Sequence, residues 1–148
     1  HGCGDLENYE DMAAWHQRQV ALTKPETLPE GYAPAKIWLV MEPVTQDGAS
    51  DRLIGLSNLR LELTDYLRQF GGHVGYSIAP DCWGQGYGTQ LLALTLDKAR
   101  QEGLQRLLIT CDQSNLGSAR VIEKNGGILE NMVTQPDGNL LCRYWIDL

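Results

Sequence analysis

The feature that most constrains the fold of this chain is a glycine-rich segment between a short apolar run and a long amphipathic one. The run from Val74 to Ile78 favours a β-strand, and Pro80 must end it because proline has no N–H for a central sheet. Three glycines follow within five residues, and from Thr89 the leucine spacing fits one face of a helix that stops near Gly103. A glycine-rich turn before a helix exposes backbone N–H groups at the positive end of the helix dipole. The segment therefore predicts an anion-binding site, and phosphate is the anion we expect.

Spacing narrows the choice of phosphate ligand. The P-loop of nucleotide triphosphatases requires a lysine directly after its last glycine, and no lysine lies between Gly71 and Asp97. The Rossmann dinucleotide fingerprint requires a third glycine at the position that Thr89 occupies. Neither motif is present, and a glycine-rich loop can also be a plain turn.

Composition excludes several classes of protein. The 148 residues are most simply one domain, 1–148, and a net charge of −7 without clustered Lys and Arg argues against nucleic acid as a partner. The longest apolar run, 37–41, is far too short to span a membrane. The four cysteines and three histidines show no metal-ligand spacing, so we expect no metal, and free thiols favour a cytoplasmic location.

The order of predicted elements defines the fold class. A helix is expected over 5–22, with Ala13, His16 and Val20 on its apolar stripe, and a loop or short helix over 64–72. Asn115 or Ser114 is expected to cap a third helix that ends at Lys124. The strands are expected at 36–42, 52–63, 74–78, 105–111, 127–134 and 139–147. A β-α-β crossover around the glycine loop implies parallel strands there, so we predict an α+β fold with a mixed sheet flanked by helices.

Two motifs together resemble the GNAT superfamily of acyl-CoA-dependent N-acyltransferases. The first is the loop after the Pro-terminated strand, and the second is the segment from Asn115 to Gly127, in which Asn115, Ser118, Lys124 and Gly126 match. Shorter stretches resemble a subgroup of predicted bacterial acetyltransferases of undefined substrate. One position departs from the family, because Trp83 stands where Arg or Gln is usual. The usual first strand and helix of the family also have no counterpart in these residues.

The resemblance implies acetyl-CoA as the acyl donor, held between the strands 74–78 and 107–111. Backbone groups of the first strand would pair with the pantetheine, the Ile78 N–H could polarise the thioester carbonyl, and the glycine loop would bind the pyrophosphate. The cofactor-binding residues so implied are Tyr76, Ser77, Ile78, Gly84, Gln85, Gly86, Tyr87, Gly88, Thr89, Asn115 and Ser118.

The reaction implied is direct transfer of the acetyl group to a primary amine of a small molecule or peptide. A base must take the amine proton, and we consider two candidates: His73, for its intrinsic pKa, and Glu62, on the solvent-facing side of a strand. The tyrosine that the family often uses to protonate the departing thiolate aligns with Ile122, which has no proton to give. A non-catalytic acyl-CoA sensor and a purely structural domain are therefore the alternatives.

The strand over 36–42 is expected at an edge of the sheet with its apolar side chains exposed. An edge of that kind predicts a two-fold homodimer that covers it. Alternatively, the loop over 23–35 covers the edge and the chain remains a monomer.

Overall fold

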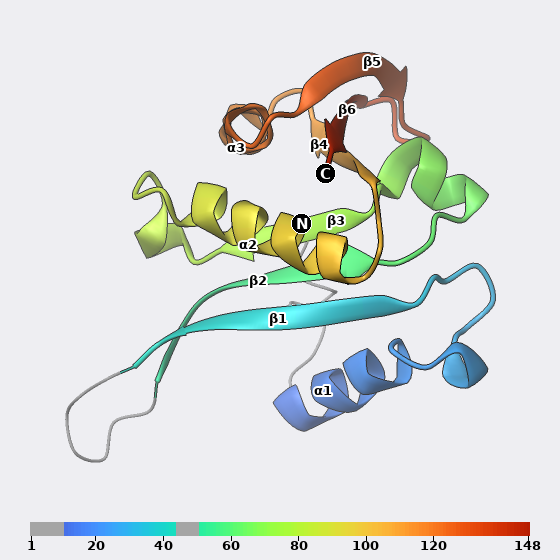
Figure 1. The fold of residues 1–148 in the computed structure, drawn as a ribbon, viewed down its shortest axis with the longest axis vertical. Helices are drawn as coiled ribbons and strands as arrows, with labels where there is room; N and C mark the ends of the chain where they lie inside the picture. The colour runs from blue at the N-terminus through green and yellow to red at the C-terminus, as the bar shows by residue number, and fades with distance from the viewer. Residues whose placement is uncertain (1–10, 44–50) are drawn as a thin grey trace.

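The computed structural model describes residues 11–43 and 51–148, and within them six strands form one sheet in the order β1-β2-β3-β4-β6-β5 (Figure 1). Only β3 and β4 run parallel, and the other neighbouring pairs are antiparallel. The predicted α+β fold with a mixed sheet is therefore confirmed. The strands are β1 (Ala35–Glu42), β2 (Arg52–Arg60), β3 (Val74–Ile78), β4 (Arg106–Asp112), β5 (Ile128–Thr134) and β6 (Leu140–Asp147).

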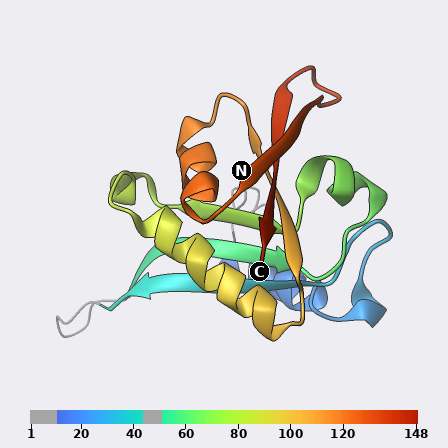
Figure 2. The same cartoon turned by 45° about the horizontal axis from the view of Figure 1, so that its top comes forward.

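The helix α2 (Tyr87–Gln101) covers one face of β1, β2 and β3 (Figure 2). Its buried side chains, among them Leu92 and Ala99 at 0% exposure, join the main apolar core, which explains the leucine spacing. The helix ends two residues before Gly103, whose φ of +83° suits glycine. A second helix, α3 (Leu116–Lys124), lies beside α2 (Figure 2). Asn115 caps α3, because its side-chain oxygen accepts from the Ser118 N–H at 3.0 Å.

The first helix, α1 (Met12–Ala21), lies on the opposite side of the sheet from α2 (Figure 2). Asp11 is its N-cap and has extended backbone angles, so the predicted helix over 5–22 does not run through this residue, and residues 5–10 lie outside the described chain. The predicted stripe is wrong, because His16 and Val20 are exposed and Trp15 and Gln19 are buried instead. The helix therefore turns its 15/19 face inward, which buries the large indole of Trp15.

The strand β2 ends at Arg60, three residues earlier than predicted. The Leu61 N–H still donates to the Pro34 carbonyl at 2.8 Å, in register with the β1–β2 pair. Pro34 has no N–H to donate in return, so the strand pair ends here although apolar residues continue to alternate. A π-helical turn, η3 (Leu67–Gly71), follows and agrees with the predicted short helix. Short 3-10 turns, η2 (Pro25–Thr27) and η4 (Pro80–Cys82), complete the described elements.

The strand β1 lies at an edge of the sheet, with β2 as its one strand neighbour in the described chain. Its Leu39 and Met41 side chains are 48% and 43% exposed. The predicted apolar edge is therefore present, whereas the dimer remains a prediction. Within residues 11–43 and 51–148, no helix is long and apolar enough to cross a membrane.

Candidate active site

The glycine loop joins β3 to α2 and leaves the start of the helix open. Gly84 and Gly86 have φ values of +75° and +89°, a region that side chains with a Cβ rarely adopt, and both are exposed. α2 begins at Tyr87, two residues before the predicted start, with Gly86 as an N-cap that has no side chain to occupy the first N–H groups. Because the first N–H groups of a helix have no partners within it, the Gly86–Thr89 backbone can bind an anion.

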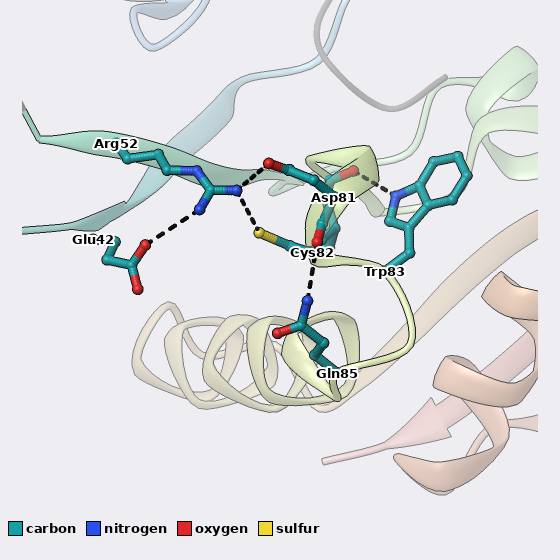
Figure 3. Close-up of polar contacts among 7 residues, drawn as sticks. Glu42, Arg52, Asp81, Cys82, Trp83 and Gln85 are labelled. Carbon is teal, nitrogen blue, oxygen red and sulfur yellow. Dashed lines mark hydrogen bonds and ion pairs between the residues drawn. The ribbon is translucent and has the colours of Figure 1, made fainter.

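The residues before the glycines are fastened to the sheet by side-chain contacts (Figure 3). Arg52, at the start of β2, forms an ion pair with Asp81, donates to the Cys82 Sγ at 3.3 Å and lies 3.6 Å from the Glu42 carboxylate. The Gln85 Nε2 donates to the Asp81 carbonyl at 3.0 Å. The Gln85 side chain therefore shapes the loop, which leaves its backbone N–H as the group available to a ligand.

Trp83 makes a polar contact that the sequence did not suggest. Its indole Nε1 donates to the carbonyl of Ile78 at 2.7 Å, although the ring is 68% exposed (Figure 3). The contact ties the loop to the last residue of β3.

The strands β3 and β4 separate toward the end of β3 that leads into the glycine loop. In the described chain their one aligned pair is Val74 with Ile109, whereas β3 stays paired with β2 along its whole length. The Ala79 N–H donates to the Ile54 carbonyl of β2 at 2.7 Å. Because alternate residues of a strand point their backbone groups to opposite edges, Tyr76 and Ile78 turn theirs toward the β4 side. The gap therefore has backbone donors and acceptors along one wall.

The side chains of Tyr76 and Ser118 meet across this region. The Tyr76 hydroxyl lies 2.8 Å from the Ser118 Oγ, which links β3 to the first turn of α3. Burial raises the pKa of Tyr76 to about 12, so its hydroxyl keeps its proton at neutral pH. Ile122, further along α3, is 0% exposed and lies within the apolar core. Ile122 therefore has a packing role, and it offers no hydroxyl to protonate a departing thiolate.

His73 is held in a structural arrangement between β3 and β4. The ring Nδ1 of His73 accepts from the backbone N–H of Leu108 at 2.9 Å, and the backbone N–H of His73 donates to the carbonyl of Leu108 at 2.7 Å. Burial, with a smaller contribution from the nearby Arg68 and Arg60, lowers the pKa of His73 to about 4. Since Nδ1 is the acceptor, Nε2 carries the proton of the neutral ring. The geometry does not leave a free basic nitrogen.

Glu62 lies in the bend after β2 rather than on a strand face, because β2 ends at Arg60. Its side chain is exposed. The structure thus places the two predicted bases differently, with His73 buried between strands and Glu62 in solvent. Their catalytic role stays a prediction.

Two residues near the site were missed from the sequence. Asn125 Nδ2 donates to the Thr89 carbonyl at 3.2 Å and to the Val121 carbonyl at 2.9 Å, which joins the end of α3 to the first turn of α2. Asn58 lies within β2 and is 7% exposed. Asparagine is depleted from strands, so its presence in an apolar one was a signal that we did not use.

The site fits an acyl-CoA on its own geometry. An added Cβ at Gly84 or Gly86 would meet no atom within 4 Å, so open space lies in front of the loop where a pyrophosphate would bind. The gap between β3 and β4 continues from this loop and offers backbone groups for an amide-containing arm. A split sheet with an open helix start beside the split therefore fits an extended, phosphate-bearing ligand.

The family follows from sequence comparison. Residues 5–128 match the family model described as the acetyltransferase (GNAT) domain. The chain therefore belongs to the GNAT acetyltransferases and is an acyltransferase. No protein of curated function matches the sequence at a significant level.

Solved structures support the fold. A point mutant of the spermidine N-acetyltransferase from Vibrio cholerae is 17% identical, with a TM-score of 0.66 over 94% of this chain and 76% of that chain. A protein from Salmonella typhimurium solved with its cofactor acetyl-CoA is 21% identical, with a TM-score of 0.52 over 65% and 58%. The ribosomal-protein-S5-alanine acetyltransferase from Vibrio fischeri is 20% identical, with a TM-score of 0.55 over 65% and 55%. The chain thus spans little more than half of the last two.

Proposed function

We propose that the protein transfers the acetyl group of acetyl-CoA to a primary amine by direct attack. The observation that carries the proposal is the separation of β3 and β4 beside the open start of α2. The pyrophosphate binds the backbone of Gly84 to Thr89, and the pantetheine pairs with Tyr76 and Ile78 as an added strand. Ser118 contacts the Tyr76 side chain from α3, and Asn115 caps that helix, so both would contact the cofactor from the side facing β3.

The chemistry needs a neutral amine, an oxyanion donor and a place for the proton. The N–H groups of Tyr76 and Ile78 face the gap and are the donors available to the thioester oxygen, of which we favour Ile78. The CoA thiolate can leave without help from Ile122, because a thiol pKa of about 8.5 makes it a good leaving group. Glu62 is favoured over His73 as the base, since its carboxylate is in solvent and the His73 Nδ1 already accepts a hydrogen bond.

Calorimetric titration with acetyl-CoA tests the binding step. Gly86→Val should abolish binding, because a β-branched side chain disfavours the φ of +89° and its Cβ enters the space in front of the loop. Gly138→Val is the matched control: Gly138 has a φ of +87° and open surroundings, but lies in the β5–β6 turn. Unchanged affinity in Gly86→Val would place the phosphate site elsewhere.

A free-thiol assay with three amines tests the transfer step. The amines are n-butylamine, spermidine and a short peptide with an N-terminal alanine, the last two because the similar structures include acetyltransferases named for such acceptors. Thiol release that depends on the amine supports the proposal. Binding without turnover would leave an acyl-CoA sensor, and no binding would leave a structural domain. A cytoplasmic location is part of the proposal, since its acetyl-CoA must come from metabolism.

A further inference from the structure

A tyrosine side chain crosses the gap between β3 and β4. The hydroxyl of Tyr76 on β3 lies 2.8 Å from the Ser118 Oγ and 3.3 Å from the Ser118 carbonyl oxygen. Ser118 belongs to the first turn of α3, which follows β4 in the chain and lies on the other side of β3 from β2 (Figure 1). The Tyr76 side chain therefore spans from one side of the gap to the other, and a ligand that fills the gap must pass it.

The phenol lies on the face of the sheet from which the acyl donor of the proposed function approaches. Tyr76 is the register partner of Ser57, whose Oγ accepts from the Thr95 hydroxyl of α2 at 2.9 Å. Directly opposed residues of neighbouring strands share a face, so the Tyr76 side chain is on the α2 side, where the glycine loop leads into that helix. Tyr76 and Ser118 are both half-buried, so the pair is not sealed inside the core.

We infer that the Tyr76 hydroxyl donates a hydrogen bond to the sulfur of the acyl donor as the thiolate leaves. The inference rests on the proposed function, which brings the thioester to the N–H groups of Tyr76 and Ile78 in this gap. Ile122 lies one helical turn after Ser118 on the same side of α3. The Tyr76 hydroxyl thus supplies from β3 the polar group that α3 does not offer at Ile122.

The step balances without a proton from the tyrosine. The amine nitrogen forms a bond to the thioester carbon with its lone pair, the carbon–sulfur bond breaks, and the sulfur leaves as a thiolate with the electron pair. One amine proton goes to the base, and the thiolate takes a proton from water after release. Burial raises the pKa of Tyr76 to about 12, well above that of a thiol at about 8.5, so the phenol keeps its proton. It acts as a fixed donor toward the charge that develops on sulfur.

The Ser118 hydroxyl frees the tyrosine proton for this contact. Either oxygen of the pair can be the donor in the bond between them. When Ser118 donates to the Tyr76 oxygen, the phenol proton is available to a third atom. The same bond fixes the end of the Tyr76 side chain beside α3, so the donor is in place before the reaction.

Titration with free CoA tests the contact without an acceptor amine. A hydrogen bond to the thiolate lowers the pKa of the bound thiol, so CoA should bind more tightly as the pH rises from 7 to 9, by about tenfold for each unit of lowering. Acetyl-CoA has no thiol and is the reference for other effects of pH. Tyr76→Phe retains the ring without the hydroxyl, so it should lose this gain while its affinity for acetyl-CoA stays unchanged.

Amine-dependent thiol release tests the consequence for catalysis. Tyr76→Phe should lower kcat about tenfold or more at unchanged KM for acetyl-CoA, because a hydrogen bond to a charged group contributes that much.

Tyr144→Phe is the matched control. Tyr144 lies on β6, which β4 separates from the gap, and it is 4% exposed. Its hydroxyl also bonds to α3, donating to the Glu123 carboxylate at 3.3 Å, and burial raises its pKa to about 12 as well. Tyr144→Phe should leave both kcat and the pH dependence of CoA binding unchanged.

Two results would overturn the inference. One is a Tyr76→Phe protein with the kcat and the pH dependence of CoA binding of the natural chain. The other is a Tyr144→Phe protein that loses as much activity as Tyr76→Phe, because the effect would then come from packing around α3. Failure of the proposed function is distinct from these. A natural chain that binds no acetyl-CoA removes both proposals, whereas binding without thiol release removes the transfer step and leaves the CoA titration to decide the Tyr76 contact.

Discussion

The buried imidazole of His73 should make the protein lose stability on mild acidification. The ring is 7% exposed, and burial lowers its pKa to about 4 from an unfolded value of about 6.5. Between these values the unfolded chain binds a proton that the folded chain does not, so the free energy of unfolding rises with pH there. The contribution is fully present above the unfolded pKa and is lost as pH falls toward 4. Each pKa unit is worth about 1.36 kcal/mol, which gives about 3 kcal/mol in all.

His73→Asn isolates this effect from the titration of the carboxylates. The Asn Oδ1 can accept the Leu108 N–H that His73 Nδ1 accepts at 2.9 Å, but it does not titrate. Urea unfolding of both proteins at pH 7 and pH 4.5 measures the difference. We expect the natural chain to lose about 2 kcal/mol more than His73→Asn over this range. Equal losses would show that the histidine does not remain neutral in the fold.

Three further outcomes are expected. His73→Asn should retain amine-dependent thiol release within a few-fold, since the Nδ1 of His73 is used by Leu108, and a loss of several hundred-fold at unchanged stability would restore His73 as the base. Ile122→Ala should lower the free energy of unfolding by about 2–5 kcal/mol in urea titrations, because Ile122 is 0% exposed, and a loss of turnover at unchanged stability would contradict the packing role. Light scattering at micromolar concentration should give twice the 16.5 kDa chain mass, with Leu39→Lys on β1 reducing it, and a mass near 16.5 kDa for the natural chain would exclude the dimer.

The sequence predicted those elements for which the spacing of apolar residues agrees with the Pro and Gly residues at their ends. Pro80 and the glycines after it mark the end of β3 and the start of α2 by backbone chemistry alone, so the structure follows the prediction to within two residues. The end of β2 was not predictable in this way. Leu61 and Leu63 continue the alternation beyond Arg60, whereas the residue opposite Leu61 is Pro34, which is distant in sequence and has no N–H to complete the pair.

Contacts between distant segments account for the rest. Periodicity predicted a stripe with His16 and Val20 for α1, but the fold buries Trp15 and Gln19 instead. The interactions of His73 were not visible either, because its partner Leu108 lies in a strand that follows a whole helix. An intrinsic pKa suggests a base, but the environment that moves it is set by the fold.

The gap between β3 and β4 persists because both of its ends are fixed. At the closed end, His73 binds Leu108 through its ring and its backbone. At the open end, α2 and α3 pack closely, since a Cβ added to Gly88 of α2 would lie only 3.2 Å from the Val121 side chain of α3. This contact keeps α3 beside the strands. The N–H groups of Tyr76 and Ile78 therefore cannot reach β4, and a polar group left unpaired costs about 1–3 kcal/mol when water is excluded. The Ile78 carbonyl is already bound by the Trp83 indole. In the proposed complex, an extended ligand would thus gain hydrogen bonds from the two N–H groups and the Tyr76 carbonyl without first separating a strand pair.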